Sequence, residues 1–307
     1  MTFDEGAIIH HIRARFPGGA DLHDDCGLLP EPLVGERLLV TTDVMESGQH
    51  FRLDWHPPRL LGRKLLAVNL SDLDASGARP LGFTLTLALG REVGADWILE
   101  LLEGLAEGAE AAGIPVLGGD TVGRAEGVGL GVTAYGTAAR WLRRDHVRPG
   151  DRLYVDQPLG ASLRGLRKLQ AGQRWDPAQP DPDLAAHLDP RPHLGLGRRL
   201  ADLREVHACI DLSDGLSRDL RMLAEASGVS VRLASDLAED ELRGGEDYAR
   251  CFASDAAQAD LEARLGLGLR CVGQALERGS APLLYDGGQG LRPLPDLSFD
   301  HFAPEVR

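Results

Sequence analysis

Apolar and polar positions follow two rhythms along the chain, one typical of strands and one typical of helices. Short runs rich in Leu, Val and Thr predict strands at 35–43, 82–90, 114–120, 128–138, 152–156, 206–211, 248–253 and 269–276. Apolar residues at three- to four-residue spacing predict helices at 58–77, 95–113 and 216–226. Because strands and helices interleave, the pattern predicts an α/β or α+β fold.

The turn-rich segment Arg143–Asp151 has the character of a domain boundary, so we expect two domains, 1–145 and 146–307. The Pro- and Asp-rich stretch 176–193 is expected to be an exposed loop or a connection between helices. The tail from Gly279 is rich in Gly and Pro and predicts turns.

The composition of the chain argues against several classes of protein. The chain has 307 residues and a formal net charge of −14, which argues against a nucleic-acid partner. No apolar run approaches the roughly 18 residues of a membrane span, and the first residues do not resemble a signal peptide, so we expect a cytoplasmic protein without a membrane partner. The four cysteines follow no common zinc-ligand spacing.

Aspartates recur beside apolar runs, in LLVTTD, VLGGD, ACIDLSD, DLHDDCGLL and AVNLSD. Carboxylates at the ends of several core elements can converge, and hard oxygen ligands suit Mg²⁺, which is often bound together with substrate phosphates. The acids in question are Asp24, Asp25, Asp43, Asp72, Asp120, Asp211 and Asp214.

Each acid also has a structural interpretation. Asp214 fits a helix N-cap, and Asp120 fits a glycine-rich turn in GGDT. Asp72 needs a partner, because it lies within an otherwise apolar helical stretch. The chain contains no Walker A sequence, dinucleotide fingerprint, nucleophile elbow or HExxH pattern, which disfavours the common nucleotide-binding and hydrolase folds.

Taken in order, the segments HDDCGLL, TTDVMESGQHF, AVNLSDLDASGARP, GGDT, DLSDGLSRDL, GGEDY and FDHFA resemble thiamine-monophosphate kinases. That family belongs to the superfamily of aminoimidazole ribonucleotide synthetase. The matches run from Asp24 to Ala303, nearly the whole chain. The resemblance implies two α/β domains and a homodimer in which the N-terminal sheets form a shared barrel.

The resemblance also implies residue roles. Positions that match magnesium-binding sites of the family are Asp25, Thr41, Thr42, Asp43, Asp72, Asp120, Asp211 and Asp214. Positions that match ATP contacts are Gly119, Asp120, Arg144 and Ser213. Positions that match contacts to thiamine monophosphate are His50, Glu246 and Phe299. Phe299 offers an aromatic face to a cation, and Arg144 can form paired hydrogen bonds to phosphate.

The implied reaction is direct in-line transfer of the γ-phosphoryl group of ATP to the phosphate of thiamine monophosphate, with several Mg²⁺ ions and no covalent nucleophile. Alignment and charge neutralisation would carry catalysis. The alternatives are another ATP-dependent synthetase of the superfamily, a maturation factor that acts through protein partners, and a non-catalytic metal-binding relative. The chain departs from the family pattern at His23 and in the short region 235–244.

Overall fold

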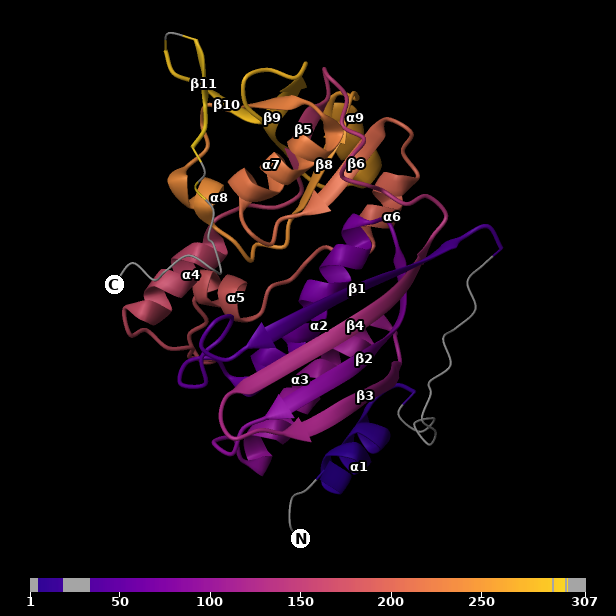
Figure 1. Cartoon of the computed structure of the whole chain (residues 1–307), viewed down its shortest axis with the longest axis vertical. Coiled ribbons are helices and arrows are strands. Elements are labelled where there is room, and N and C mark those ends of the chain that lie inside the picture. Colours follow the sequence, from indigo (N-terminus) through magenta and orange to yellow (C-terminus); the bar gives the residue numbers. More distant parts are fainter. Residues whose placement is uncertain (1–4, 19–33, 289, 296, 298–307) are drawn as a thin grey trace. The chain divides into compact units, whose positions relative to one another are not determined.

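The computed structural model describes residues 5–18, 34–288, 290–295 and 297 (Figure 1). Its helices are α1 (Glu5–Arg15), α2 (Pro58–Ala75), α3 (Ala95–Ala112), α4 (Ala161–Gln170), α5 (Pro182–Leu188), α6 (Leu196–Ala201), α7 (Leu216–Ser227), α8 (Glu239–Arg243) and α9 (Gln258–Leu265). Its strands are β1 (Arg37–Glu46), β2 (Arg79–Leu89), β3 (Val116–Gly123), β4 (Val128–Ala138), β5 (Arg152–Val155), β6 (Val206–Asp211), β7 (Ser230–Leu233), β8 (Arg250–Ser254), β9 (Arg270–Leu276), β10 (Leu283–Asp286) and β11 (Leu291–Pro293). The helices and strands predicted from periodicity are confirmed.

The chain divides into two compact units. Unit 1 comprises residues 1–141, 169–181 and 188–198, and unit 2 comprises residues 142–168, 182–187 and 199–307. The segments 169–181 and 188–198, which follow the first strand of unit 2 in the sequence, therefore belong to unit 1. The mixed α/β character expected from the sequence is present in both units.

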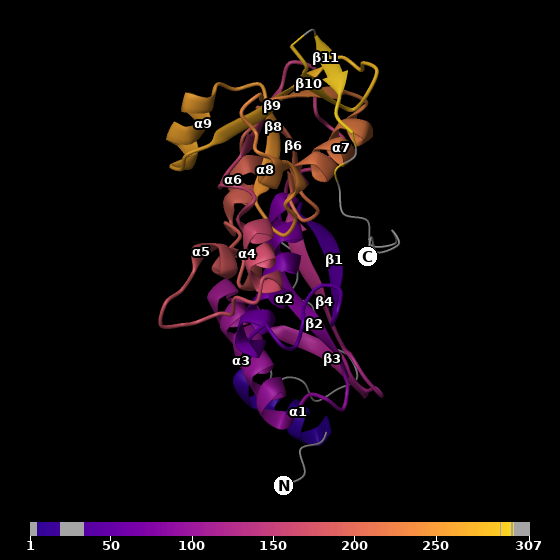
Figure 2. The same ribbon diagram turned by 90° about the vertical axis from the view of Figure 1, so that its left-hand side faces the viewer.

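In unit 1 the described strands form one sheet in the order β1-β4-β2-β3. β4 pairs antiparallel with β1 and β2, and β3 pairs parallel with β2. α2 and α3 cover one face of this sheet, as Figure 2 shows. Leu residues of both helices and alternate residues of the strands form the core between them. α3 ends where Gly113 adopts a left-handed conformation with φ of 66°.

The other face of this sheet is open in the described chain. Leu38, Val40 and Val44 of β1 and Val122 of β3 are exposed apolar side chains, and Val40 is 65% exposed. The alternation of a strand puts Thr41 and Asp43 on the helix-covered face and Thr42 on the open face.

In unit 2 the described strands form a second sheet in the order β11-β10-β7-β9-β5-β8-β6. α7 packs against β6, β7 and β10. Two short strands that the sequence analysis did not predict, β10 and β11, form in the described part of the tail. The Pro- and Asp-rich stretch contains the short helix α5. Within the described residues, no helix is both long and apolar enough to cross a membrane.

Candidate active site

A polar link joins β1 to α2 at the predicted metal ligands of unit 1. The Thr41 hydroxyl donates to Oδ2 of Asp72 at 2.6 Å, so Asp72 has the partner that its place in an apolar helix requires. The backbone N–H of Asp43 donates to Oδ1 of Asn69 at 3.1 Å. Asn69 is fully buried, and its amide also donates to the carbonyl of Leu65. Thr41, Asp43 and Asp72 therefore gather on the helix-covered face.

Asn69 was not among the predicted site residues. Asn69 holds the backbone of Asp43 against α2, and so it restrains the position from which the Asp43 side chain extends. The available signal was an amide within the apolar run LLAVNL, because a buried amide needs hydrogen-bond partners.

Thr42 lies on the opposite face from its neighbours. Its hydroxyl contacts the carbonyl of Val132 at 3.1 Å and the hydroxyl of Thr133 at 3.0 Å. The side chain of Thr42 is thus directed away from the group formed by Thr41, Asp43 and Asp72.

The GGDT segment lies inside β3, so the structural interpretation of Asp120 as part of a glycine-rich turn was wrong. A Cβ atom on Gly119 would meet the carbonyl oxygen of Leu85 at 2.0 Å, so glycine is required by the close approach of β2. Asp120 is exposed and stands in register with Thr86, which is exposed as well. Asp120 therefore shares the open face of the sheet with Val122.

Asp43 and Asp120 do not converge within unit 1. They lie on the two edge strands of the sheet, three strand spacings or about 14 Å apart, and on opposite faces. Mg²⁺ binds its ligands at about 2.1 Å, so one ion is out of reach of both carboxylates. Among the described residues, no group of three or more His, Cys, Asp or Glu side chains is placed to hold a metal ion. Asp25 lies outside the described residues.

His50 is held in the tight turn that follows β1. Its Nδ1 accepts the backbone N–H of Glu46 at 2.9 Å, and its own N–H donates to the carbonyl of Glu46 at 2.9 Å. An accepting Nδ1 leaves the proton of a neutral imidazole on Nε2. The ring can therefore present an N–H donor on its other edge.

In unit 2 the DLSDG turn connects β6 to α7. Asp211 ends β6 and is buried, while Asp214 is half-buried and lies 3.3 Å from the guanidinium of Arg218. The fully buried Asp219 accepts the backbone N–H of Asp214 at 3.1 Å and so closes the turn. Asp219 was not among the predicted site residues. Its position in the first turn of the predicted helix, four residues after Gly215, could have indicated a role in this turn.

The acids of this turn are of the chemical type that binds a divalent cation, although the described residues form no group of three placed to hold one. Burial raises the pKa of Asp219 well above its ordinary value, and the nearby charges of Asp211 and Asp214 raise it further. Its buried Oδ1 has no hydrogen-bond partner among the described residues. Hard oxygen donors whose negative charges repel one another are the kind of set that Mg²⁺ neutralises.

Backbone hydrogen bonds join the GGEDY segment to the DLSDG turn. The N–H of Glu246 donates to the carbonyl of Ser213 at 2.7 Å, and the N–H of Tyr248 donates to that of Leu212 at 2.8 Å. Glu246 and Tyr248 have φ angles of 61° and 50°, a conformation that non-glycine residues rarely adopt. Such strain persists where the surroundings enforce it, often at functional sites. Ser213 and Glu246 are therefore neighbours.

Asp247 anchors the other side of this segment. Its carboxylate accepts the N–H of Gly160 at 2.7 Å and of Ser162 at 3.3 Å, at the start of α4. Burial raises the pKa of Asp247 to about 6, against the opposing effect of these two hydrogen bonds. The loop that carries Glu246 is thus fixed to α4 as well as to the DLSDG turn.

The two other predicted contacts are Arg144 and Phe299. Arg144 is exposed, and its carbonyl accepts the hydroxyl of Ser227 at 2.9 Å. Phe299 lies outside the described residues.

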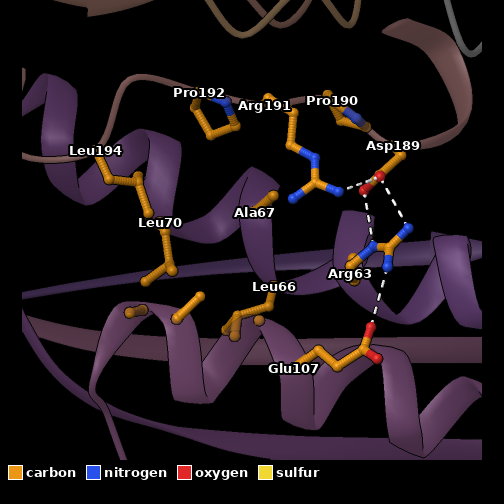
Figure 3. Close-up of a pocket in the computed structure, with 13 residues that line it drawn as sticks. Arg63, Leu66, Ala67, Leu70, Glu107, Asp189, Pro190, Arg191, Pro192 and Leu194 are labelled. Carbon is orange, nitrogen blue, oxygen red and sulfur yellow. Dashed lines mark hydrogen bonds and ion pairs between the residues drawn. The ribbon is translucent and has the colours of Figure 1, made fainter. Parts of the chain in front are cut away.

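A cavity of about 290 Å³ lies in unit 1, and its lining includes none of the predicted site residues (Figure 3). It is formed by α2, α3 and the segment 189–194, with Leu66 and Leu70 among its apolar lining. Arg63 closes one end by donating to Asp189 and Glu107. Because none of the predicted site residues lines it, this cavity is not the candidate active site.

Two domain profiles match the chain. They are described as AIR synthase related protein, N-terminal domain, over residues 23–138, and AIR synthase related protein, C-terminal domain, over residues 148–258. The Salmonella typhimurium thiamine-monophosphate kinase is 34% identical over 312 residues, which cover 91% of each chain. The Escherichia coli K12 thiamine-monophosphate kinase is 35% identical over 303 residues, again 91% of each chain.

Solved structures agree with this result. The thiamine-monophosphate kinase of Stenotrophomonas maltophilia superposes with a TM-score of 0.76 at 34% identity, covering 94% of this chain and 98% of that one. AaThiL in complex with AMPPCP and TMP superposes with a TM-score of 0.76 at 26% identity, covering 89% and 90%. The E. coli hydrogenase maturation protein HypE reaches a TM-score of 0.78 at 18% identity, which shows a shared fold alone. By sequence identity and coverage, the chain belongs to the thiamine-monophosphate kinase family of enzymes, whose two-domain α/β fold it has.

Proposed function

We propose that this protein transfers the γ-phosphoryl group of ATP to the phosphate of thiamine monophosphate and so forms thiamine diphosphate. The observation that carries the proposal is the backbone link between Ser213 and Glu246, which joins a turn rich in acids to a segment expected to contact thiamine. AaThiL, which shares the fold of this chain at 26% identity, has a solved structure in complex with AMPPCP and TMP. The family membership supports the same pair of substrates.

The acids are proposed to hold Mg²⁺. In unit 1 the donors would be Thr41, Asp43 and Asp72, and in unit 2 they would be Asp211 and Asp214. Asp25, Thr42 and Asp120 complete the proposed set. When bound, the ions would neutralise the charge of the transferring and accepting phosphates. The chain's own contribution is to orient the phosphates, and no side chain forms a covalent intermediate.

Recognition of the two substrates is proposed to use different residues. Gly119, Asp120, Arg144 and Ser213 would contact ATP. His50, Glu246 and Phe299 would contact thiamine monophosphate. Glu246 brings a carboxylate to a substrate that carries a thiazolium cation, and the accepting Nδ1 of a neutral His50 places the ring proton on Nε2. The acceptor phosphate is largely ionised near neutral pH, so the reaction needs no strong general base.

We also propose a homodimer built on the open face of the unit 1 sheet. Leu38, Val40, Val44 and Val122 make this face apolar, and a second copy of the same face would cover it. Asp120 lies on this face, away from Asp43, so a second copy would change which carboxylates are close together. The cytoplasmic location and the absence of nucleic-acid and membrane partners stay predictions from the sequence.

The proposed reaction is tested by incubating the protein with ATP, Mg²⁺ and one acceptor at a time: thiamine monophosphate, free thiamine or aminoimidazole precursors. Products are identified by mass. Thiamine diphosphate formed only from the monophosphate supports the proposal. ATP turnover with another acceptor would retain the kinase or synthetase chemistry and reject the substrate. ATP binding without turnover of any acceptor would favour a binding or maturation role.

A further inference from the structure

A buried histidine contacts the carboxylate of Glu246. His187 lies on α5, within the Pro- and Asp-rich stretch for which no function was predicted, and it is 4% exposed. Its Nδ1 lies 3.1 Å from Oε2 of Glu246 and 3.1 Å from the hydroxyl of Ser162. The three residues come from the α5 helix, the start of α4 and the GGEDY segment, so the contact depends on tertiary structure.

The contact between His187 and Glu246 requires a particular tautomer of the ring. An ionised carboxylate only accepts hydrogen bonds, so Nδ1 must carry a proton to bond Oε2 of Glu246. With a proton on Nδ1, the Ser162 hydroxyl oxygen is an acceptor for the ring, since a hydroxyl can both accept and donate. One carboxylate oxygen of Glu246 is thereby directed towards α5, while the side chain remains 26% exposed.

The backbone of Glu246 is already fixed. Its N–H is bonded to Ser213, its φ angle is positive, and the next residue, Asp247, is bonded to the start of α4. The contact with His187 adds a restraint on the rotamer of the Glu246 side chain. Ordering a glutamate side chain costs on the order of 1 to 2 kcal/mol, and a partner that holds it beforehand removes part of that cost.

We propose that His187 is a positioning residue that holds the Glu246 carboxylate ready for the cationic part of the substrate. This inference rests on the proposed function, because it assumes that Glu246 faces thiamine monophosphate. His187 would act through Glu246 without touching the reacting phosphates. Its removal should weaken binding of thiamine monophosphate and leave binding of ATP and the chemical step largely unchanged.

A second buried histidine in the same unit offers a matched control. Nδ1 of His207 lies 2.9 Å from Oδ2 of Asp151, and both side chains are almost fully buried. Asp151 is therefore enclosed by protein, whereas Glu246 retains an accessible part. A variant at His207 reports the cost of losing a buried histidine–carboxylate pair that has no substrate to position.

The test compares His187→Phe, His187→Asn and His207→Phe in the full-length protein with ATP, Mg²⁺ and thiamine monophosphate. H187F lacks the donor, and we expect KM for thiamine monophosphate to rise roughly tenfold while KM for ATP and kcat stay within about twofold. H187N keeps a donor near the position of Nδ1, and it should restore most of the lost affinity. H207F should lower the melting temperature without a selective rise in KM.

A double-mutant cycle with Glu246→Gln separates positioning from general damage. If His187 acts through Glu246, H187F should add little to the KM effect of E246Q. Full additivity, or an unchanged KM in H187F while the wild type forms thiamine diphosphate, would overturn this inference and leave the proposed function standing. Failure of the wild type to phosphorylate thiamine monophosphate would overturn the proposed function itself.

Discussion

At the scale of single residues, the candidate site consists of side chains whose positions are fixed by neighbours on other elements. Thr41 bonds Asp72, Asn69 bonds the backbone of Asp43, and Asp219 closes the turn that carries Asp214. These contacts restrain the positions of Asp72, Asp43 and Asp214. Each can be tested by a substitution that removes one function and keeps the shape.

The carboxylate of Asp43 should be needed for activity and not for folding. Asp43→Asn keeps the size of the side chain and the backbone bond to Asn69, and removes the charge proposed to hold Mg²⁺. We expect kcat to fall by at least about a hundredfold, with an unchanged circular dichroism spectrum. Asp54→Asn is the control, because Asp54 is exposed and paired with Arg52. A folded D43N variant with normal turnover would refute the assigned role.

Gly119 should be required for packing. In Gly119→Ala the new Cβ would meet the Leu85 carbonyl at 2.0 Å, so β2 and β3 must separate. We expect a loss of about 1 to 3 kcal/mol in the free energy of unfolding, measured with urea. Gly123→Ala on the same strand has open space around its Cβ and serves as the control. Equal stability of the two variants would show that the strands relax without cost.

At the scale of elements, the site of unit 2 is a junction of three pieces of backbone. The DLSDG turn, the GGEDY segment and the start of α4 are joined by hydrogen bonds through Ser213, Leu212 and Asp247. Because these bonds link segments far apart in the sequence, the strained φ angles of Glu246 and Tyr248 can persist. The junction also places an ionisable group where protonation affects stability.

Asp247 should make stability depend on pH between about 4 and 6. Its pKa is about 6 in the folded protein and 3.8 ordinarily, so the folded state holds a proton in this range that the unfolded chain has released. This contribution to stability is complete below pH 3.8 and is lost as the pH rises to about 6, by up to about 3 kcal/mol. Asp247→Asn has no proton to lose. The stability of D247N relative to the wild type should therefore rise between pH 4 and 6 and then level off.

Urea unfolding at several pH values measures that difference. Both proteins share every other titrating group, so most remaining pH effects cancel in the comparison. A difference that stays flat from pH 4 to 7 would mean that the Asp247 carboxyl titrates as it does in the unfolded chain.

At the scale of the whole molecule, the two faces of the unit 1 sheet differ in character. Four apolar side chains on β1 and β3 are exposed there, and Asp120 stands among them. The opposite face is covered by α2 and α3 and carries Asp43. The expected convergence of all the acids is therefore not reached within unit 1.

Charges on the open face should separate the proposed dimer. The double variant Val40→Glu and Val44→Glu puts two carboxylates on a surface that is proposed to be buried between copies, and unpaired buried charges are costly. We expect the mass measured by light scattering to fall from two chains to one, with loss of activity. Leu291→Glu, at an exposed apolar position of β11, is the control and should keep the mass of the wild type. A monomeric wild type, or a variant that stays dimeric, would reject this interface.

Much of the fold could be predicted from local patterns. The period of α3 and its terminal Gly113, and the alternation of β1, depend on residues close in sequence, so their assignments are confirmed. The apolar residues around Asp72 in the sequence also predicted that its carboxylate needs a hydrogen-bond partner. The set of segments sufficed to indicate the family, because the segments occur along this chain in the order in which the family has them.

Other features depend on which strands are neighbours, and local pattern carries no such information. The strand order places Asp43 and Asp120 about 14 Å apart on opposite faces, although both follow similar apolar runs. The requirement for Gly119 arises from the backbone of β2, and the GGDT segment is a strand because β2 pairs with it. His187 reaches Glu246 across 59 residues of sequence only because α5 packs beside the GGEDY segment. Local patterns were enough to predict the elements, the acids and the family, because they depend on residues close in sequence. Which of those side chains meet depends on long-range strand pairing and packing.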